Sequence, residues 1–252
     1  MNELAARLDL EPAAFVVCLC AVMAAGLVRG FAGFALSAVV MAAIATIIPP
    51  VELIPICWFM ELMASFLLLR GGVGEADRKV VFGLVIGSVI GSPIGLYATN
   101  AVDADTSRTI ALGLVAVLAA LQLLKVRARA LATTGGLYAS GLAAGVVTGL
   151  ANIGGMVVAL YVLARDAPPR VMRASLILYL FVTSPVAFLY LLAYGMIDGP
   201  AIARALVFGV VSSLGVIIGR RFFNPTLEPF YKRFCLTLLI ALAVWGLVRL
   251  AL

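Results

Sequence analysis

The sequence predicts an all-α polytopic membrane protein built from two inverted repeats, and three observations carry the prediction. Apolar residues make up 64% of the chain and charged residues 12%, which is too little polar surface to cover a soluble core. Windows without charge, such as 80–98, 110–124 and 175–197, are of spanning length or close to it, because a helix needs about 20 residues to cross the hydrocarbon. One glycine-interrupted apolar stretch occurs twice.

The duplicated stretch runs from Gly26 to Pro50 and again from Gly145 to Pro169. A shift of 119 residues without a gap, which moves residue 26 to residue 145, superposes the two copies. Under this shift Gly26, Val28, Gly30, Ala32, Val39, Ala45, Pro49 and Pro50 match the same residue types at 145, 147, 149, 151, 158, 164, 168 and 169. Such a pair of interrupted segments is typical of transporters, where it marks the binding site. We therefore expect residues 1–126 and 127–252 to form two repeats of one integral membrane domain.

Each half is expected to contain one glycine-broken helix pair followed by three membrane-spanning helices. In the first half these are segment 13–48 and helices near 52–70, 80–98 and 107–125; in the second they are segment 134–164 and helices near 172–195, 201–219 and 233–251. Basic residues concentrate around 70–79, 125–129, 165–173 and 220–233, which places these short segments in the cytoplasm. Three crossings per half are an odd number, so the second repeat is inverted and both termini lie outside.

The broken segments have two interpretations, a re-entrant pair of half-helices or two short full spans. An arm of about 15 residues covers about 22 Å, less than the hydrocarbon thickness, which favours re-entry. Local thinning of the bilayer would accommodate two spans. Pro49-Pro50 and Pro168-Pro169 are expected where a broken pair ends, because the residue before a proline leaves the α region. Stepped glycines are expected to pack helices closely, at Gly83, Gly87, Gly91, Gly95, Gly215 and Gly219.

The glycine cluster near the middle of each broken segment is the candidate substrate site. Non-helical backbone inside a membrane is tolerated where it is buried in protein or lines a watery cavity. The arm after each break, starting near Phe34 and near Gly155, would direct the positive end of its dipole at the break and favour an anion. The residues predicted to bind this anion are Arg29, Gly30, Phe31, Gly33, Phe34, Thr148, Gly149, Asn152, Gly154 and Gly155. Further polar candidates for the cavity lining are Ser37, Tyr161, Tyr179 and Ser184.

Arg29 and Glu61 are charged residues deep inside apolar segments. A central arginine costs about 2.5–3.5 kcal/mol on insertion scales, so it is expected to face the interior with a partner. Two roles are open: a structural Arg29–Glu61 ion pair, or substrate binding by Arg29 with Glu61 as a proton-coupling acid. An ion pair that opens on binding would combine them. Asn152 has a similar choice between donating to an oxyanion and capping the broken helix, and Phe31 and Phe34 between core and gate.

Several classes of function are disfavoured by what the sequence lacks. There is no histidine, no GxxxxGK[ST] nucleotide loop and no GxGD motif, so we expect neither an enzyme nor an ATP-hydrolysing subunit. The four cysteines lie in apolar stretches without metal-ligand spacing, so no metal or cofactor is expected. The net charge of +6 reflects the short basic segments and therefore indicates topology rather than nucleic-acid binding. The acidic N-terminus is the opposite of a signal peptide.

Three motifs resemble the sulfite exporter TauE/SafE family of membrane permeases. They are Arg29-Gly30-Phe31-Ala32-Gly33-Phe34, the Pro49-Pro50 pair with the intramembrane acid Glu61, and Thr148 to Gly155 followed by Pro168-Pro169. The resemblance covers nearly the whole chain in length and repeat plan. It implies a bacterial inner-membrane transporter of small sulfur-containing anions such as sulfite or organosulfonates, acting in export or uptake.

The sequence therefore predicts a secondary transporter for a small sulfur-containing anion, working by alternating access around the two broken segments. The anion and the lipid bilayer are its expected partners, and the substrate, the direction of transport and a homo-oligomeric state are left open. Proton or sodium coupling is expected where the anion is concentrated against the membrane potential. The alternatives are an anion channel and a carrier for another small anion, either a carboxylate or another oxyanion.

Overall fold

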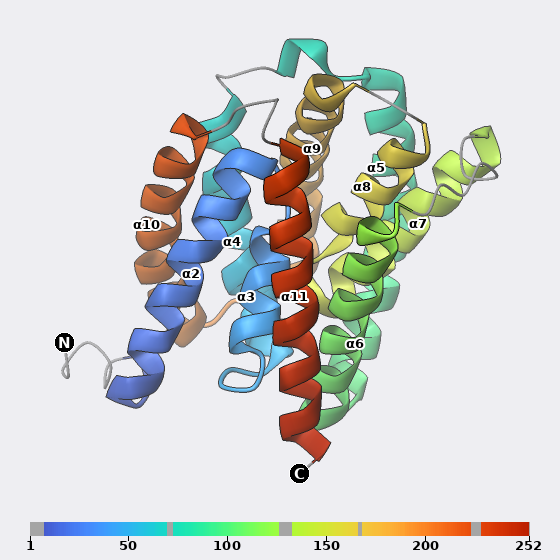
Figure 1. Cartoon of the computed structure of the whole chain (residues 1–252). Coiled ribbons are helices and arrows are strands. Elements are labelled where there is room, and N and C mark those ends of the chain that lie inside the picture. The colour runs from blue at the N-terminus through green and yellow to red at the C-terminus, as the bar shows by residue number, and fades with distance from the viewer. Residues whose placement is uncertain (1–7, 70–72, 126–132, 166–167, 223–227, 252) are drawn as a thin grey trace.

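The structure is a computed structural model that describes residues 8–69, 73–125, 133–165, 168–222 and 228–251. Within these ranges the regular structure is ten α-helices and one 3-10 turn (Figure 1). The first half contains α2 (Pro12–Ala32), α3 (Leu36–Ile44), α4 (Pro50–Leu69), the 3-10 turn η1 (Val73–Glu75), α5 (Arg78–Ala101) and α6 (Ala104–Leu123). The second contains α7 (Thr134–Ala151), α8 (Gly154–Ala164), α9 (Pro169–Ala193), α10 (Gly199–Arg221) and α11 (Glu228–Ala251). The order is as predicted: a broken pair and then three long helices in each half.

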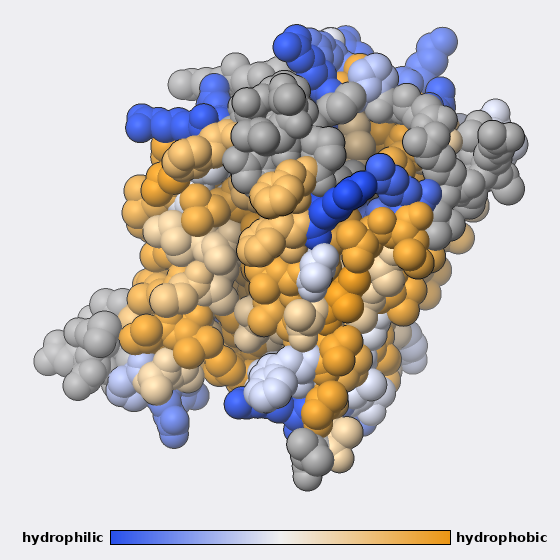
Figure 2. Space-filling view, viewed as in Figure 1, coloured by the Kyte–Doolittle hydropathy of each residue, from blue (hydrophilic) through white to orange (hydrophobic). Residues whose placement is uncertain are grey.

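Seven of the described helices are long and apolar enough to cross a membrane. They are α2, α4, α5, α6, α9, α10 and α11, and α8 is a shorter apolar helix. On the face seen in Figure 2, apolar side chains form a broad band and hydrophilic ones gather toward the two ends. Large apolar side chains such as Ile90, Ile94 and Val210 are more than half exposed, which suits contact with lipid. The chain is a multi-pass α-helical membrane protein.

The two broken pairs have arms of unequal length, so the expectation of a central break with arms of about 15 residues is wrong. The arms are 21 and 9 residues long in α2 and α3, and 18 and 11 in α7 and α8. At 1.5 Å per residue α2 is about 31 Å long and α3 about 13 Å. In Figure 1 each short arm turns back along its long arm. Each pair therefore combines a long arm with a short one, and of the two long arms α2 is among the helices that are long and apolar enough to cross a membrane.

Two glycine seams hold the halves together and explain why the long arms continue through their glycines. α2 packs on α10 and α5 packs on α7, so each seam joins a helix of one half to a helix of the other. A Cβ on Gly26 would lie 2.2 Å from the Ser212 carbonyl oxygen, and one on Gly91 would lie 2.2 Å from that of Leu142. Helix backbones approach this closely where side chains are absent. The same backbone crowding confirms a packing role for Gly87, Gly91, Gly95, Gly215 and Gly219, while Gly83 meets the Leu137 side chain.

The helix packing is reciprocal about the duplication. Under the 119-residue shift α2 corresponds to α7 and α5 to α10, so the two seams are counterparts. The corresponding helices α4 and α9 pack on each other, as do α6 and α11. In Figure 1 the start of α2 and the end of α11 lie at one end of the bundle, and α5 and α9 begin at the other. This packing is compatible with an inverted repeat; the repeat relation and the outside location of both termini stay predictions.

The predicted repeat boundary between residues 126 and 127 lies outside the described residues. Polar N-caps fix where several helices begin, with a side-chain oxygen accepting from the first turn: Asp77 for α5, Asp103 for α6, Thr133 for α7 and Asp198 for α10. The two proline pairs mark the start of the helix that follows each broken pair, since α4 begins at Pro50 and α9 at Pro169. Proline is favoured in a first turn because its missing N–H has no partner there in any case.

Replacing Gly91 by alanine should destabilise the bundle, because the added Cβ would lie 2.2 Å from the Leu142 carbonyl oxygen. Overpacking of this kind costs about 1–3 kcal/mol, which a lower Tm of the detergent-purified protein measures. Gly113→Ala in α6 is the matched control, since a Cβ there meets nothing within 4 Å, and alanine should add about 0.5–1 kcal/mol of helix stability. Equal Tm values for the two variants would contradict the role assigned to the α5–α7 seam.

Candidate functional site

The first break reverses the chain between α2 and α3. α2 ends at Ala32, and Gly33 closes it by donating its N–H to the Arg29 carbonyl at 2.9 Å. Gly33 (φ 80°) and Ala35 (φ 72°) both adopt the left-handed conformation, which is uncommon for a residue with a Cβ. These two residues turn the chain back, so α3 begins at Leu36, slightly later than the start expected near Phe34.

Arg29 lies in the last turn of α2 and is fully buried, with 0% of its surface exposed. Its Nη1 donates to the Gly33 carbonyl and its Nη2 donates to Ser65 Oγ at 3.0 Å. Its Nε lies 3.1 Å from Glu61 Oε2. The ion pair that the sequence left open as one of two roles is therefore present, and the two terminal guanidinium nitrogens of Arg29 donate hydrogen bonds within the protein. Arg29 ties the end of α2 to α4.

A second guanidinium supports the same helix end. Arg173 of α9 donates from Nη2 to the Gly30 carbonyl at 2.8 Å. The last carbonyls of a helix carry the negative end of its dipole, where cations are stabilising. The C-terminus of α2 is therefore held by two positive charges, one from each half of the chain.

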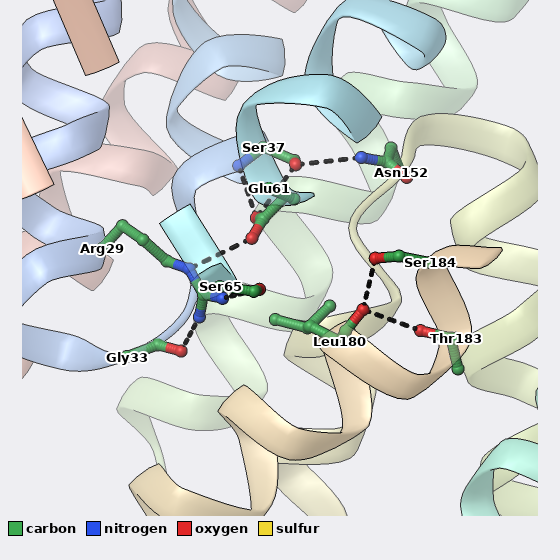
Figure 3. A network of polar contacts seen from close by, with 9 residues as sticks. All are labelled: Arg29, Gly33, Ser37, Glu61, Ser65, Asn152, Leu180, Thr183 and Ser184. Atoms are coloured by element: carbon green, nitrogen blue, oxygen red, sulfur yellow. Dashed lines mark hydrogen bonds and ion pairs between the residues drawn. The ribbon is translucent and has the colours of Figure 1, made fainter. Parts of the chain in front are cut away.

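The Glu61 carboxylate meets the opposite kind of helix end, the start of α3. Its Oε1 accepts from the Ser37 backbone N–H at 3.3 Å and from the Ser37 hydroxyl at 3.1 Å. A negative charge is favourable at this positive end of the helix dipole. Glu61 thus occupies the anion position of the first break, with Arg29 on one side and α3 on the other, as Figure 3 shows.

The second break is closed by Asn152. Its φ is 54°, and its N–H donates to the Thr148 carbonyl at 2.7 Å, which caps α7. Its side-chain Nδ2 donates to Ser37 Oγ at 3.1 Å. Because Ser37 also binds Glu61, polar contacts run without interruption from Arg29 in the first half to Asn152 in the second (Figure 3). The backbone of Asn152 serves as the cap, while its carboxamide joins the network.

A small cavity of about 30 Å³ lies beside this network, and we call it the central cavity. Four of the residues predicted for substrate binding or coupling line it: Glu61, Thr148, Asn152 and Gly154. The other lining residues come from α4, α5 and α9 and are Trp58, Ser88, Val89, Ser92, Tyr179, Leu180, Thr183, Ser184, Val186, Ala187 and Tyr190. One water needs about 10–15 Å³, so the central cavity has room for a few water-sized groups.

The other predicted residues near the first break do not line the central cavity. Arg29 lies behind Glu61, and Phe34 is 4% exposed in the hydrophobic core. Phe31 is partly buried and packs against the same core. Gly33 contacts the side chain of Arg173, because a Cβ added at Gly33 would lie 2.7 Å from Arg173 Cγ. The structure brings these residues together at the end of α2 and leaves the cavity lining to others.

Gly30 and Gly149 occupy corresponding places in the two glycine seams. A Cβ on Gly30 would lie 2.4 Å from the Val216 carbonyl oxygen, and one on Gly149 would lie 2.4 Å from the Leu96 backbone nitrogen. Neither residue is among those that line the central cavity. Their place in this structure is close helix packing, which brings the broken pairs against their neighbours.

The 119-residue shift shows why the two breaks differ. Glu61 corresponds to Leu180, and Arg29 corresponds to Thr148. Leu180 is a residue of α9 whose side chain packs against the start of α8, with its Cδ2 3.6 Å from where a Cβ on Gly155 would be. The start of α8 therefore faces the central cavity with a leucine where the first half has a carboxylate. Comparing the repeats position by position beyond Pro50 and Pro169 would have revealed this difference from the sequence.

Hydroxyl groups on α5 and α9 form another part of the cavity wall. The Ser88 and Tyr179 hydroxyls are 2.6 Å apart, and Ser88 also donates to the Gly141 carbonyl at 2.9 Å. Tyr179 and Ser184 were expected as lining residues, and both line the cavity. The remaining hydroxyl residues of this wall have no distinguishing sequence signal, because apolar helices carry serine and threonine routinely.

Tyr190 joins α9 to α5 beside the central cavity. Its hydroxyl donates to the Val89 carbonyl at 2.9 Å. That carbonyl lacks its usual helical donor because Pro93, four residues later, has no N–H. One turn further along α9, the Tyr194 hydroxyl donates to the Pro93 carbonyl at 3.1 Å. α5 and α9 are therefore fastened together at the proline.

A bundle of membrane-spanning helices with two interrupted pairs that meet at a buried polar network is an architecture of secondary transporters. The family comparison identifies the particular group: the model for the sulfite exporter TauE/SafE matches residues 18–246. The chain belongs to this family of membrane transporters, which confirms the resemblance seen in the sequence. No curated protein and no solved structure matches the chain.

The Arg29–Glu61 pair should stabilise the fold as a unit. Arg29→Gln or Glu61→Gln alone leaves the other charge buried and unpaired, at a cost of about 3–5 kcal/mol. The double variant removes both charges and should recover much of this loss. Tm values of the wild type, both single variants and the double variant form a double-mutant cycle. Additive losses across the cycle would contradict the assigned coupling.

Proposed function

We propose that this protein is a secondary transporter that carries a small sulfur-containing anion, sulfite or an organosulfonate, across the bacterial inner membrane by alternating access. The difference between the two breaks carries this proposal. The first break already holds a carboxylate, that of Glu61, at the start of α3. The second break directs the start of α8 at the central cavity with Leu180 in the corresponding place. The substrate anion lies in the central cavity at the start of α8, beside Leu180, and has there the role that the Glu61 carboxylate has at the start of α3.

The start of α8 has the properties of an oxyanion site. The first N–H groups of a helix have no acceptor within it, and the helix dipole is positive there. Gly154 and Gly155 begin α8, so the helix start contributes no side chain of its own, while Thr148 lies against Gly154 and Leu180 against Gly155. Phosphate and sulfate bind such helix starts readily, and sulfite and sulfonates share their tetrahedral or pyramidal oxygens. The local chemistry therefore favours a sulfur oxyanion.

Asn152 supplies the side-chain donor. Its carboxamide nitrogen carries two hydrogens, and one of them is donated to Ser37 Oγ at 3.1 Å. The second is available to a substrate oxygen in the cavity that Asn152 lines. Thr148 is a weaker donor because its hydroxyl hydrogen already goes to the Ala144 carbonyl at 2.7 Å. Asn152 therefore both donates a hydrogen bond to the substrate and contacts Ser37, which binds Glu61.

Glu61 connects substrate binding to proton movement. It lines the same cavity, so an anion at the start of α8 brings a second negative charge near its carboxylate. Uptake of a proton by Glu61 would release Arg29 from its partner and change the contact between α2 and α4. This sequence of events couples proton binding, anion binding and a change at the first break.

Asn152→Gly should weaken sulfite or methanesulfonate binding about 10- to 100-fold, since a hydrogen bond to a charged group contributes about 1.5–3 kcal/mol. Glycine accepts the φ of 54° at this position, so the change removes the carboxamide without straining the backbone. Ligand-induced Tm shifts of purified protein give the affinities. Asn100→Ala in α5 is the control, because Asn100 lies outside the central cavity. Unchanged affinity in Asn152→Gly would show that the anion does not bind at the second break. Absence of binding of either anion by the wild type would contradict the proposed function.

Transport in proteoliposomes should be coupled to protons. Methanesulfonate stays ionised across the neutral range, so any proton movement that accompanies its flux is carried by the protein. We expect saturable methanesulfonate counterflow and a flux that responds to an imposed pH gradient. The control is an imposed sodium gradient at constant pH, which should leave the flux unchanged. A flux without counterflow would indicate a channel, and a response to sodium alone would contradict the role of Glu61.

A further inference from the structure

Trp58 of α4 stands between two hollows of very different character. On one side it lines the central cavity of about 30 Å³, among hydroxyl groups, Asn152 and Glu61. On the other side it lines an apolar groove of about 300 Å³ between α4, α9 and α10, which we call the lateral groove. Pro55, Phe59, Phe188, Leu192 and Leu206 are among the residues that form the lateral groove. A single side chain therefore contacts both spaces.

The indole of Trp58 is held in place by contacts to α9. Its ring stacks on Phe188, with centroids 5.2 Å apart and planes 21° from parallel. Its Nε1 donates to the Ser184 carbonyl at 3.0 Å. Stacking and a directed hydrogen bond together fix the orientation of the ring. Trp58 is thus a firm wall of the central cavity rather than a loosely placed side chain.

We propose that Trp58 sets the size limit of the transported anion. The inference rests on the proposed function and deepens it, because it concerns what an oxyanion at the start of α8 carries on its fourth substituent. The central cavity, of about 30 Å³, has about one tenth of the volume of the lateral groove, so it favours the smallest sulfur oxyanions and leaves little room for an alkyl substituent. A longer alkyl chain meets the Trp58 ring.

Removing the ring would join the two hollows. The lateral groove is lined by apolar side chains, so it offers an alkyl chain the environment that such a chain prefers over water. Each methylene buried there should tighten binding about fourfold, as expected from the usual contribution of a buried methylene. The smallest anions, which do not reach the wall, should lose little. Trp58 therefore determines which alkyl-chain lengths are accepted, while residues at the second break recognise the sulfonate group.

The test is a chain-length series of methane-, ethane-, butane- and hexanesulfonate, with affinities measured on the purified full-length protein. In the wild type we expect affinity to fall as the chain grows. In Trp58→Ala we expect it to rise about fourfold per methylene until the lateral groove is filled. Trp245→Ala is the matched control: Trp245 lies on α11, is 60% exposed and contacts Arg249. This control should keep the wild-type profile, which also reports any partitioning of the longer sulfonates into detergent.

Phe188→Ala provides a second opening of the same wall, should Trp58→Ala fail to fold. Phe188 lies against Trp58 from the lateral groove, and its removal should shift the profile in the same direction. The inference is overturned if wild-type affinity rises with chain length, or if both wall variants keep the wild-type profile. Binding of methanesulfonate that depends on Asn152 with an unchanged chain-length profile contradicts this inference alone. Absence of binding by every sulfonate and by sulfite contradicts the proposed function as well.

Discussion

Helix ends buried within a membrane protein have no bulk water to satisfy them, so the protein must supply their partners. The first break solves this with charge: Arg29 and Arg173 meet the carbonyl end of α2, and Glu61 meets the N–H end of α3. Arg29 and Glu61 balance each other's charge, and each of the three charged side chains also lies at the helix end whose dipole it complements. Because Arg29 is fully buried, this arrangement holds only while Glu61 remains its partner. The geometry of α2, α3 and α4 depends on that pair.

The second half uses the same backbone plan with different chemistry. Thr148 and Leu180 stand where Arg29 and Glu61 stand in the first half. The end of α7 is closed by its own Asn152, and the start of α8 faces a cavity instead of a carboxylate. The first break is therefore neutralised within the protein by a charged pair, whereas the second break has Thr148 and Leu180 at the corresponding positions. In the proposed function the substrate anion supplies at the second break the negative charge that Glu61 supplies at the first.

The central cavity lies where the halves meet, so it is sensitive to their relative position. Ser37 donates to Glu61 and accepts from Asn152, which ties the first break to the second through one hydroxyl. The glycine seams α2–α10 and α5–α7 cross between halves at very short distances. Rigid seams favour movements of whole helix groups over local bending. The lining of the central cavity is therefore connected to the first break through Asn152, Ser37 and Glu61.

The sequence by itself determined the membrane class, the order of the helices, the two breaks and the family. These follow from hydropathy, glycine and proline positions and the duplication, all of which are local or repeat within the chain. The Arg29–Glu61 pair was also foreseeable, because two deep charges in an apolar protein must find partners. Tertiary structure alone decided the rest. Gly30 and Gly149 belong to helix seams, and Ser88, Trp58 and Tyr190 reach the cavity, since a helix glycine or hydroxyl acquires its role only from the neighbour that packs against it.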